Sequence, residues 1–192
     1  MDRPLAGLRD AIRGWGTSAE ERELHLPCDD LVPNAAVVDR AVDVEAPTEV
    51  VFRWLCQLRA APYSYDWIDN LGRRSPRELT PGLEDLVLGQ RFMTVFRLVS
   101  FEQDEHVTIA SGRRLAVTYR VAPGRLHFRA RWPGWRIPGF ALGDLIMARR
   151  QLLNLAELSE KTATRPARRA PSANGAGRPL PGSRAPSARG RA

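Results

Sequence analysis

Apolar residues alternate with basic ones through residues 125–132, and this alternation restricts the fold more than any other feature of the chain. The apolar set is Leu126, Phe128, Ala130 and Trp132, and the polar set is Arg125, His127, Arg129 and Arg131. A period of two is typical of a strand with one buried face. Residues 115–121 alternate in the same way, with Leu115, Val117, Tyr119 and Val121 on one face. The sequence therefore predicts a half-buried antiparallel hairpin that turns at residues 122–124.

Three further strands and a helix are predicted before this hairpin. Residues 36–44 alternate as a strand whose apolar face is broken only by Arg40. Pro47 suits a first helical position, and apolar residues then recur at helical spacing from Val50 to Leu58. After a loop-rich insert, the remaining strands are predicted at residues 91–101 and 106–110.

The longest helical pattern follows the hairpin. A loop rich in proline and glycine spans residues 133–139, and apolar residues then repeat on one side through Lys161. At about 1.5 Å per residue, a helix of this length crosses a whole sheet. A single antiparallel sheet covered by one long helix is an α+β architecture.

The first 34 residues are predicted to form an arm that packs on the domain. Leu5, Leu8 and Ile12 have helical spacing. Thr17 and Glu20 fit a capping box, which predicts a second short helix near Ser18. Residues 25–33 are expected to be a loop, because Pro27 and Pro33 break regular structure there.

Residues 162–192 are predicted to be a disordered tail with no fold of its own. They contain seven arginines, no acidic residue and one large apolar residue, Leu180. Subtracting these seven from the 29 basic residues leaves 22, which equals the number of acidic residues, so residues 1–161 are formally neutral. Because the folded domain has no net positive charge, its charge gives no reason to expect that it binds nucleic acid. The tail is either an arm that contacts anionic partners or an extension without a role, and the second interpretation is favoured.

The two cysteines and the N-terminus favour a cytoplasmic protein. Cys28 and Cys56 lie far apart in sequence and are expected to be free thiols in a reducing compartment. No signal peptide is visible in residues 1–10, and no apolar run reaches the length of a membrane span.

The sequence resembles the helix-grip, START-like superfamily (the SRPBCC group, which includes polyketide cyclase-like and lipid-transfer members), and most of all an actinobacterial branch of it. The resemblance covers residues 35–161 and is carried by RAVDVEAPTEVVFRWL at 40–55, YSYDWIDN at 63–70 and GDLIMARRQL at 143–152. It implies a curved antiparallel sheet wrapped around a long C-terminal helix. It also implies an internal pocket for a lipid-like or polyketide-like molecule, and no universal catalytic residue.

A pocket of this kind is expected to be apolar with a few placed polar groups. Tyr119, Phe128 and Trp132 on the strands and Met147 on the long helix are candidates to line it. Plain core packing is the favoured alternative for most of them.

The start of the insert is a second candidate part of the pocket. Tyr63, Tyr65, Asp66 and Trp67 place three aromatic residues within five positions of a loop rich in proline and glycine. Aromatic rings with one polar group suit a ligand gate. The alternative is a plug that fills the mouth of the sheet.

Arg40 and Arg97 interrupt otherwise apolar strands. A buried guanidinium requires a partner, so either arginine could anchor an acidic group of a ligand. The favoured alternative is an ion pair within the protein or an outward orientation.

Catalytic and metal-binding patterns are weak. The three histidines lack zinc-type spacing, and no nucleophile elbow or phosphate-binding glycine loop is present, so no metal or cofactor is expected. We expect a module that binds or carries a small hydrophobic molecule. The main alternative is a cyclase or dehydratase-like enzyme with Tyr65 or His127 as acid or base, although alternation places His127 opposite Phe128. A further alternative is an interaction protein that acts through its basic tail.

Overall fold

The computed structural model describes residues 14–64, 74–133 and 138–165, with the backbone alone for residues 138–146. Seven strands form one open, curved sheet in the order β1-β2-β7-β6-β5-β4-β3. Their bounds are β1 Gly14–Trp15, β2 Ala36–Asp43, β3 Arg91–Phe92, β4 Phe96–Glu102, β5 His106–Ser111, β6 Leu115–Ala122 and β7 Arg125–Trp132. Every neighbouring pair is antiparallel except β1 and β2.

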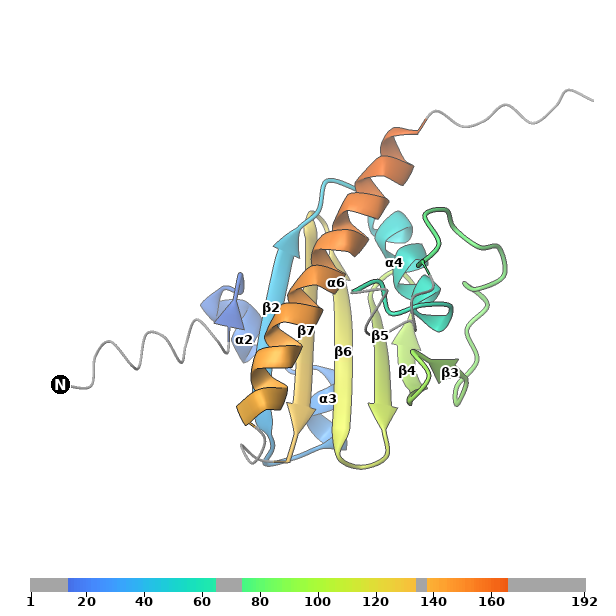
Figure 1. Cartoon of the computed structure of the whole chain (residues 1–192). Helices are drawn as coiled ribbons and strands as arrows, with labels where there is room; N and C mark the ends of the chain where they lie inside the picture. The colour runs from blue at the N-terminus through green and yellow to red at the C-terminus, as the bar shows by residue number, and fades with distance from the viewer. Residues whose placement is uncertain (1–13, 65–73, 134–137, 166–192) are drawn as a thin grey trace, which may run out of the picture.

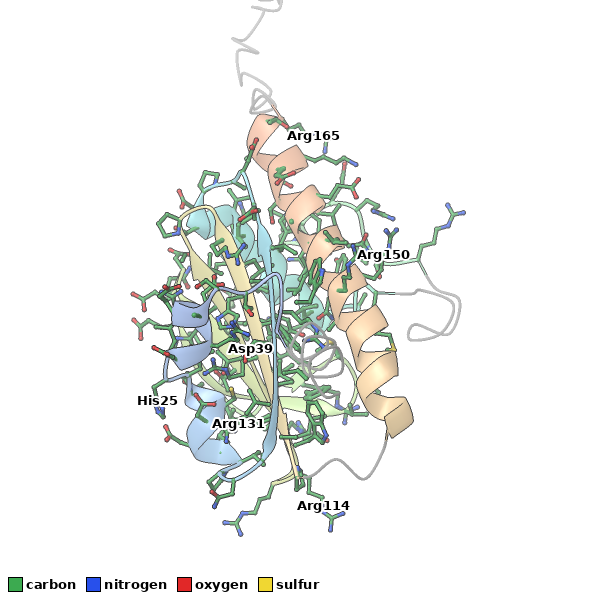
Figure 2. The ribbon with its side chains drawn as sticks, turned by 90° about the vertical axis from the view of Figure 1, so that its left-hand side faces the viewer. His25, Asp39, Arg114, Arg131, Arg150 and Arg165 are labelled. Atoms are coloured by element: carbon green, nitrogen blue, oxygen red, sulfur yellow. The ribbon has the colours of Figure 1, made fainter. Side chains whose placement is uncertain are left out.

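The molecule has three layers. The long helix α6 (Pro138–Thr164) lies diagonally across one face of the sheet, and α4 (Thr48–Cys56) packs on the same side (Figure 1). The short helices α2 (Ala19–Glu23) and α3 (Pro27–Leu31) cover the opposite face (Figure 2). We call the face toward α4 and α6 the inner face and the face toward α2 and α3 the outer face.

The main hydrophobic core lies between the inner face, α4 and α6. Helix α4 buries Phe52, Trp54 and Leu55, and the 3-10 turn η1 (Gln57–Arg59) continues it with Leu58. Among its described side chains, helix α6 buries one face, whose members are Ala148, Gln151, Leu152, Asn154, Leu155, Ala156, Leu158 and Ser159. This spacing of three and four residues is what an amphipathic helix on a sheet requires.

The α+β architecture with a long C-terminal helix across an antiparallel sheet is confirmed. The predicted strand at residues 125–132 is confirmed at both ends, and the strand predicted at 36–44 ends one residue earlier than expected. Helix α6 continues to Thr164, three residues beyond Lys161, where the sequence-based prediction ended the domain.

The single strand predicted at residues 91–101 is wrong. The chain forms a hairpin there, β3 and β4, with Phe92 opposite Phe96. Met93 and Thr94 make the turn with φ of 38° and 64°, values that non-glycine residues rarely adopt. The turn lacks a glycine, proline or asparagine signal, and the Met93 backbone N–H donates to the Leu58 carbonyl at 3.0 Å instead.

Two predictions for the N-terminal arm are wrong in detail. The capping box is formed by Ser18 and Glu21, one position after the predicted pair of Thr17 and Glu20. Helix α3 occupies the segment expected to be a loop, because Pro27 stands at its first turn and the Asp29 carboxylate accepts from the Leu26 backbone N–H at 2.8 Å.

Candidate ligand-binding site

The inner face carries one row of residues that differs from its apolar surroundings. The register places Arg40 of β2 opposite Phe128 of β7, and Phe128 opposite Tyr119 of β6. Directly opposed residues in an antiparallel sheet project from the same face. All three residues are buried, and Phe128 and Tyr119 belong to the main core. A cation, an aromatic ring and a phenol therefore follow one another across three strands.

Arg40 is fully buried in this row. Its Nη1 donates to the carbonyl of Asp39 at 2.7 Å. Its neighbours along β2 on the same face are Val38 and Val42, both buried in the main core. Across the sheet it stands opposite Trp15 of β1 and Phe128 of β7. Little water screens a guanidinium that is buried in this way, so its charge acts strongly on nearby groups.

Tyr119 links the sheet to helix α6. Its hydroxyl donates to Gln151 Oε1 at 2.6 Å, and its ring packs edge-to-face on Phe128 with centroids 5.3 Å apart. Gln151 Nε2 in turn lies 2.5 Å from the Pro62 carbonyl and 3.3 Å from Met93 Sδ. One buried amide thus joins β6, α6, the start of the insert and the β3–β4 turn.

Tyr63, at the start of the insert, is held against both helices. Its carbonyl accepts from Asn154 Nδ2 at 2.8 Å, and its ring packs edge-to-face on Trp54 at 5.8 Å. Trp54 Nε1 donates to Thr162 Oγ1 at 2.9 Å. The backbone of Tyr63 has a φ of 56°, which redirects the chain as the insert begins. Tyr63 is 2% exposed and belongs to the main core beside α4 and α6.

The other predicted pocket residues fall into three groups. Tyr65, Asp66 and Trp67 lie outside the described residues. Trp132 packs against the main core and Met147 lies on α6, and both are partly exposed. Arg97 is exposed and stands opposite Ala110, which packs toward α3, so its side chain belongs to the outer face.

The outer face holds a buried charged cluster that the sequence analysis missed. Asp39 Oδ1 accepts from Arg129 Nε at 2.7 Å and lies 2.9 Å from His127 Nε2. Arg129 Nη1 also contacts Asp29 Oδ2 at 3.0 Å. Alternation correctly separates His127 from Phe128, but the polar face is covered by α2 and α3 and not by solvent. His127 therefore lies on the opposite side of the sheet from the inner face, and it is not placed to act as an acid or base on a ligand there.

Ion pairs fasten the arm to the outer face. Arg125 Nε contacts Glu21 Oε1 at 2.7 Å, and Arg131 Nη1 contacts Asp29 Oδ1 at 2.6 Å. The Arg125 hydrogen bond lowers the pKa of Glu21 to about 2. Burial alone would raise the pKa of Asp29, but the Leu26 N–H, Arg131 and Arg129 lower it. Figure 2 shows Asp39 and Arg131 between the arm and the sheet.

The signal for this cluster was present in the sequence. Four basic residues occupy every second position of β7, and Asp39 and Asp43 share one face of β2. Pairing those two strands sets the acids against the bases, but that pairing joins residues about 90 positions apart and requires the register.

Within residues 14–64, 74–133 and 138–165, no three His, Cys, Asp or Glu side chains converge in a way that could hold a metal ion. None of the helices there combines the length and hydropathy of a membrane-spanning segment.

Comparisons with known proteins add little to this description. No protein-family model matches the sequence. No curated protein matches it either. Among solved structures, the chain is similar to the solution NMR structure of a polyketide cyclase-like protein from Corynebacterium glutamicum, with 15% identity. That alignment covers 68% of this chain and 93% of the other, at a TM-score of 0.33, so the likeness carries no argument about the site.

Proposed function

We propose that the protein binds and carries a small, largely apolar molecule between the inner face and helix α6. The observation that carries this proposal is the row Arg40, Phe128 and Tyr119. Small-molecule sites are mostly apolar and contain a few placed polar groups that fix orientation. The row has that composition, and the aliphatic residues around it supply the apolar part.

The row also favours a chemical class of ligand. A guanidinium suits a carboxylate, phenolate or enolate, and a phenol that donates to an amide can exchange that bond for one with a ligand oxygen. The ring of Phe128 between them favours a flat or extended hydrocarbon body. The proposed ligand is therefore a hydrophobic molecule with one acidic or phenolic oxygen.

Native mass spectrometry of the full chain tests this function. Oleate, cholesterol and the hydroxylated anthraquinone emodin serve as probes, together with whatever molecule co-purifies. We expect a one-to-one adduct with an acidic or phenolic probe. Tyr119→Phe, which keeps the ring, should weaken that adduct about fivefold to tenfold, because one hydrogen bond contributes about 1 kcal/mol.

The matched control is the double variant Val87→Ser and Leu88→Ser, whose two side chains are exposed and lie outside the main core. It should keep the adduct unchanged. A protein that binds none of the probes and carries no co-purifying molecule would contradict the proposal. So would an adduct that Tyr119→Phe, Trp132→Ala and Met147→Ala all leave intact.

A cyclase or dehydratase-like enzyme is the second candidate, favoured by the same row. In such an enzyme Tyr119 would supply a proton and Arg40 would stabilise an enolate. Aldol closure of a poly-β-ketone followed by dehydration releases one water. Mass spectrometry of a poly-β-ketone incubated with the protein would reveal that loss, and an unchanged substrate would favour the carrier.

A further inference from the structure

Three aliphatic side chains are exposed to an unusual degree beside strands β3 and β4. Val87, Leu88 and Val95 are 66%, 61% and 64% exposed. The other exposed large hydrophobic residues among those described reach at most 40%. Isolated exposed aliphatic residues are ordinary, but a group of them at one place marks an interaction surface.

Backbone hydrogen bonds place these residues on one edge of the sheet. The Gly89 N–H donates to the Leu98 carbonyl at 2.7 Å, and the Leu98 N–H donates to the Gln90 carbonyl at 2.9 Å. The turn that contains Val87 and Leu88 therefore runs beside β4. Val95 stands directly before β4, in the β3–β4 turn.

The same edge carries uncompensated positive charge. Arg91 and Arg97 are directly opposite in the β3–β4 register and both are exposed. Like charges in opposed positions destabilise a strand pair unless an anion lies between them. Arg97 Nη1 donates to the Gly89 carbonyl at 3.1 Å, which holds its guanidinium beside the aliphatic turn. Neither arginine forms an ion pair with any described residue.

The two ends of β4 also differ in the sign of the charge beside them. The turn between β5 and β6, at the end of the sheet where β4 begins, adds the exposed Arg113 and Arg114. The turn at the other end of β4 carries Glu102, Asp104 and Glu105. Figure 2 shows Arg114 at the end of the molecule opposite the C-terminal end of α6. Arg91, Arg97 and Val95 thus lie toward the basic end of β4.

We propose that this edge, defined by Val87, Leu88, Val95, Arg91 and Arg97, docks on the surface of a bilayer that contains anionic phospholipid. Aliphatic side chains flanked by arginines suit the boundary between headgroups and acyl chains, where the guanidinium groups bind phosphate. A single-stranded nucleic acid would require exposed aromatic rings for stacking, and the exposed large hydrophobic residues of the described chain are all aliphatic. The proposal does not depend on the contents of the inner face.

Co-sedimentation of the full chain with vesicles tests the docking. Vesicles of equal parts phosphatidylcholine and phosphatidylglycerol should bind the protein, and added salt should weaken the binding. Arg91→Gln with Arg97→Gln should lower the vesicle affinity roughly tenfold to thirtyfold, since each arginine near an anionic surface contributes about fivefold. Val87→Ser with Leu88→Ser should also lower it, including at high salt.

Matched controls separate this edge from general charge. Arg77→Gln with Arg150→Gln removes the same charge from positions near Glu157 of α6, and Leu153→Ser removes an exposed aliphatic side chain from α6. Both should bind vesicles like the unaltered chain. Thermal unfolding of every variant checks that the fold is retained.

Three outcomes would overturn the proposal. The first is absence of binding to the anionic vesicles. The second is an equal loss in the edge variants and in the α6 controls. The third is binding lost only when the arginines after Arg165 are changed to glutamine, which would assign it to the tail. Native mass spectra of the unaltered chain keep the two proposals separable, because an adduct that forms while this chain fails to bind vesicles contradicts docking alone.

Discussion

At the scale of single residues, Asp39 is the centre of the outer face. Its carboxylate accepts from Arg129 and His127, and all three side chains are buried. A buried ion pair contributes little net stability compared with apolar packing, but loss of one member leaves the other uncompensated. The arrangement therefore makes Asp39 far more sensitive to substitution than an exposed acid on the same strand.

Asp39→Ala should lower the free energy of unfolding by about 3 kcal/mol, because Arg129 and His127 then lose their shared acceptor. Asp43→Ala is the matched control. Its side chain is 90% exposed beside Arg125, so its loss should change stability by about 1 kcal/mol or less. Urea unfolding at neutral pH measures both, and equal effects would show that the cluster is not buried in solution.

Glu21 makes the stability that the arm contributes to the fold depend on pH. Its pKa is about 2 in the fold and 4.5 ordinarily, so the folded-state pKa is the lower one. The Glu21–Arg125 pair therefore stabilises the fold above the ordinary pKa, and this contribution is lost as the pH falls toward 2.

Glu21→Gln should be less stable than the unaltered chain at neutral pH, and the difference should shrink between about pH 5 and pH 2. Glu23→Gln, on the exposed side of α2, should show a small difference at every pH. Urea unfolding across this pH range measures both variants. A Glu21→Gln difference that stays constant in acid would contradict the ion pair.

At the scale of secondary-structure elements, α6 fixes the entrance of the insert. Gln151 holds the Pro62 carbonyl and the Tyr119 hydroxyl, and Asn154 holds the Tyr63 carbonyl. Two amides on successive turns of one helix thus position a segment about 90 residues earlier in the chain.

Gln151→Leu should destabilise the protein by about 2 kcal/mol, because buried polar groups of Tyr119 and Pro62 lose their partner. Arg150→Ala, at the neighbouring exposed position, should change stability by about 0.5 kcal/mol or less. Thermal and urea unfolding compare the two. A Gln151→Leu variant as stable as Arg150→Ala would contradict the hydrogen-bond arrangement.

The accuracy of the sequence predictions also differs between elements. Strands with strict alternation, such as residues 125–132, were predicted to the residue because the period alone decides them. Helix α3 was missed because a proline that begins a helix looks the same in sequence as one that ends it. The β3–β4 turn was missed because Met93 and Thr94 carry no turn signal and are held by a contact with Leu58.

At the scale of the whole molecule, the sheet separates two different layers. The inner layer is apolar with few polar groups, and the outer layer is a charged cluster sealed by the arm. Alternation predicted the contents of both faces. It could not predict that both are covered, since coverage depends on where α2 and α3 pack after the chain folds.

The candidate site was predictable in the same partial way. Tyr119 and Phe128 follow from alternation, and Arg40 stood out as a polar residue on an apolar face. Their placement in one row follows from the strand order, in which β2 pairs with β7 and not with β3, the next strand in sequence. Gln151 was not among the predicted site residues, because a glutamine on the polar–apolar boundary of a helix has no distinguishing pattern.

The two cysteines report on opening of the whole structure. Burial raises the pKa of Cys28 to about 11 and that of Cys56 to about 12, so neither is a thiolate at neutral pH. Cys28 lies on α3 of the arm, packed against the outer face, and Cys56 lies in the main core. Iodoacetamide should modify neither thiol in the native protein at neutral pH and both in urea, as mass spectrometry measures. Rapid native modification of Cys28 alone would show that the arm detaches.

The central claim is that the inner face receives the ligand, and nuclear Overhauser contacts between bound oleate and methyl-labelled protein test it most directly. We predict contacts from the oleate chain to the methyl groups of Val42, Leu126 and Leu152, which lie in the core around Arg40 and Tyr119. Oleate contacts confined to the exposed Val87 and Leu88, or an absence of any contact with inner-face methyl groups, would contradict it.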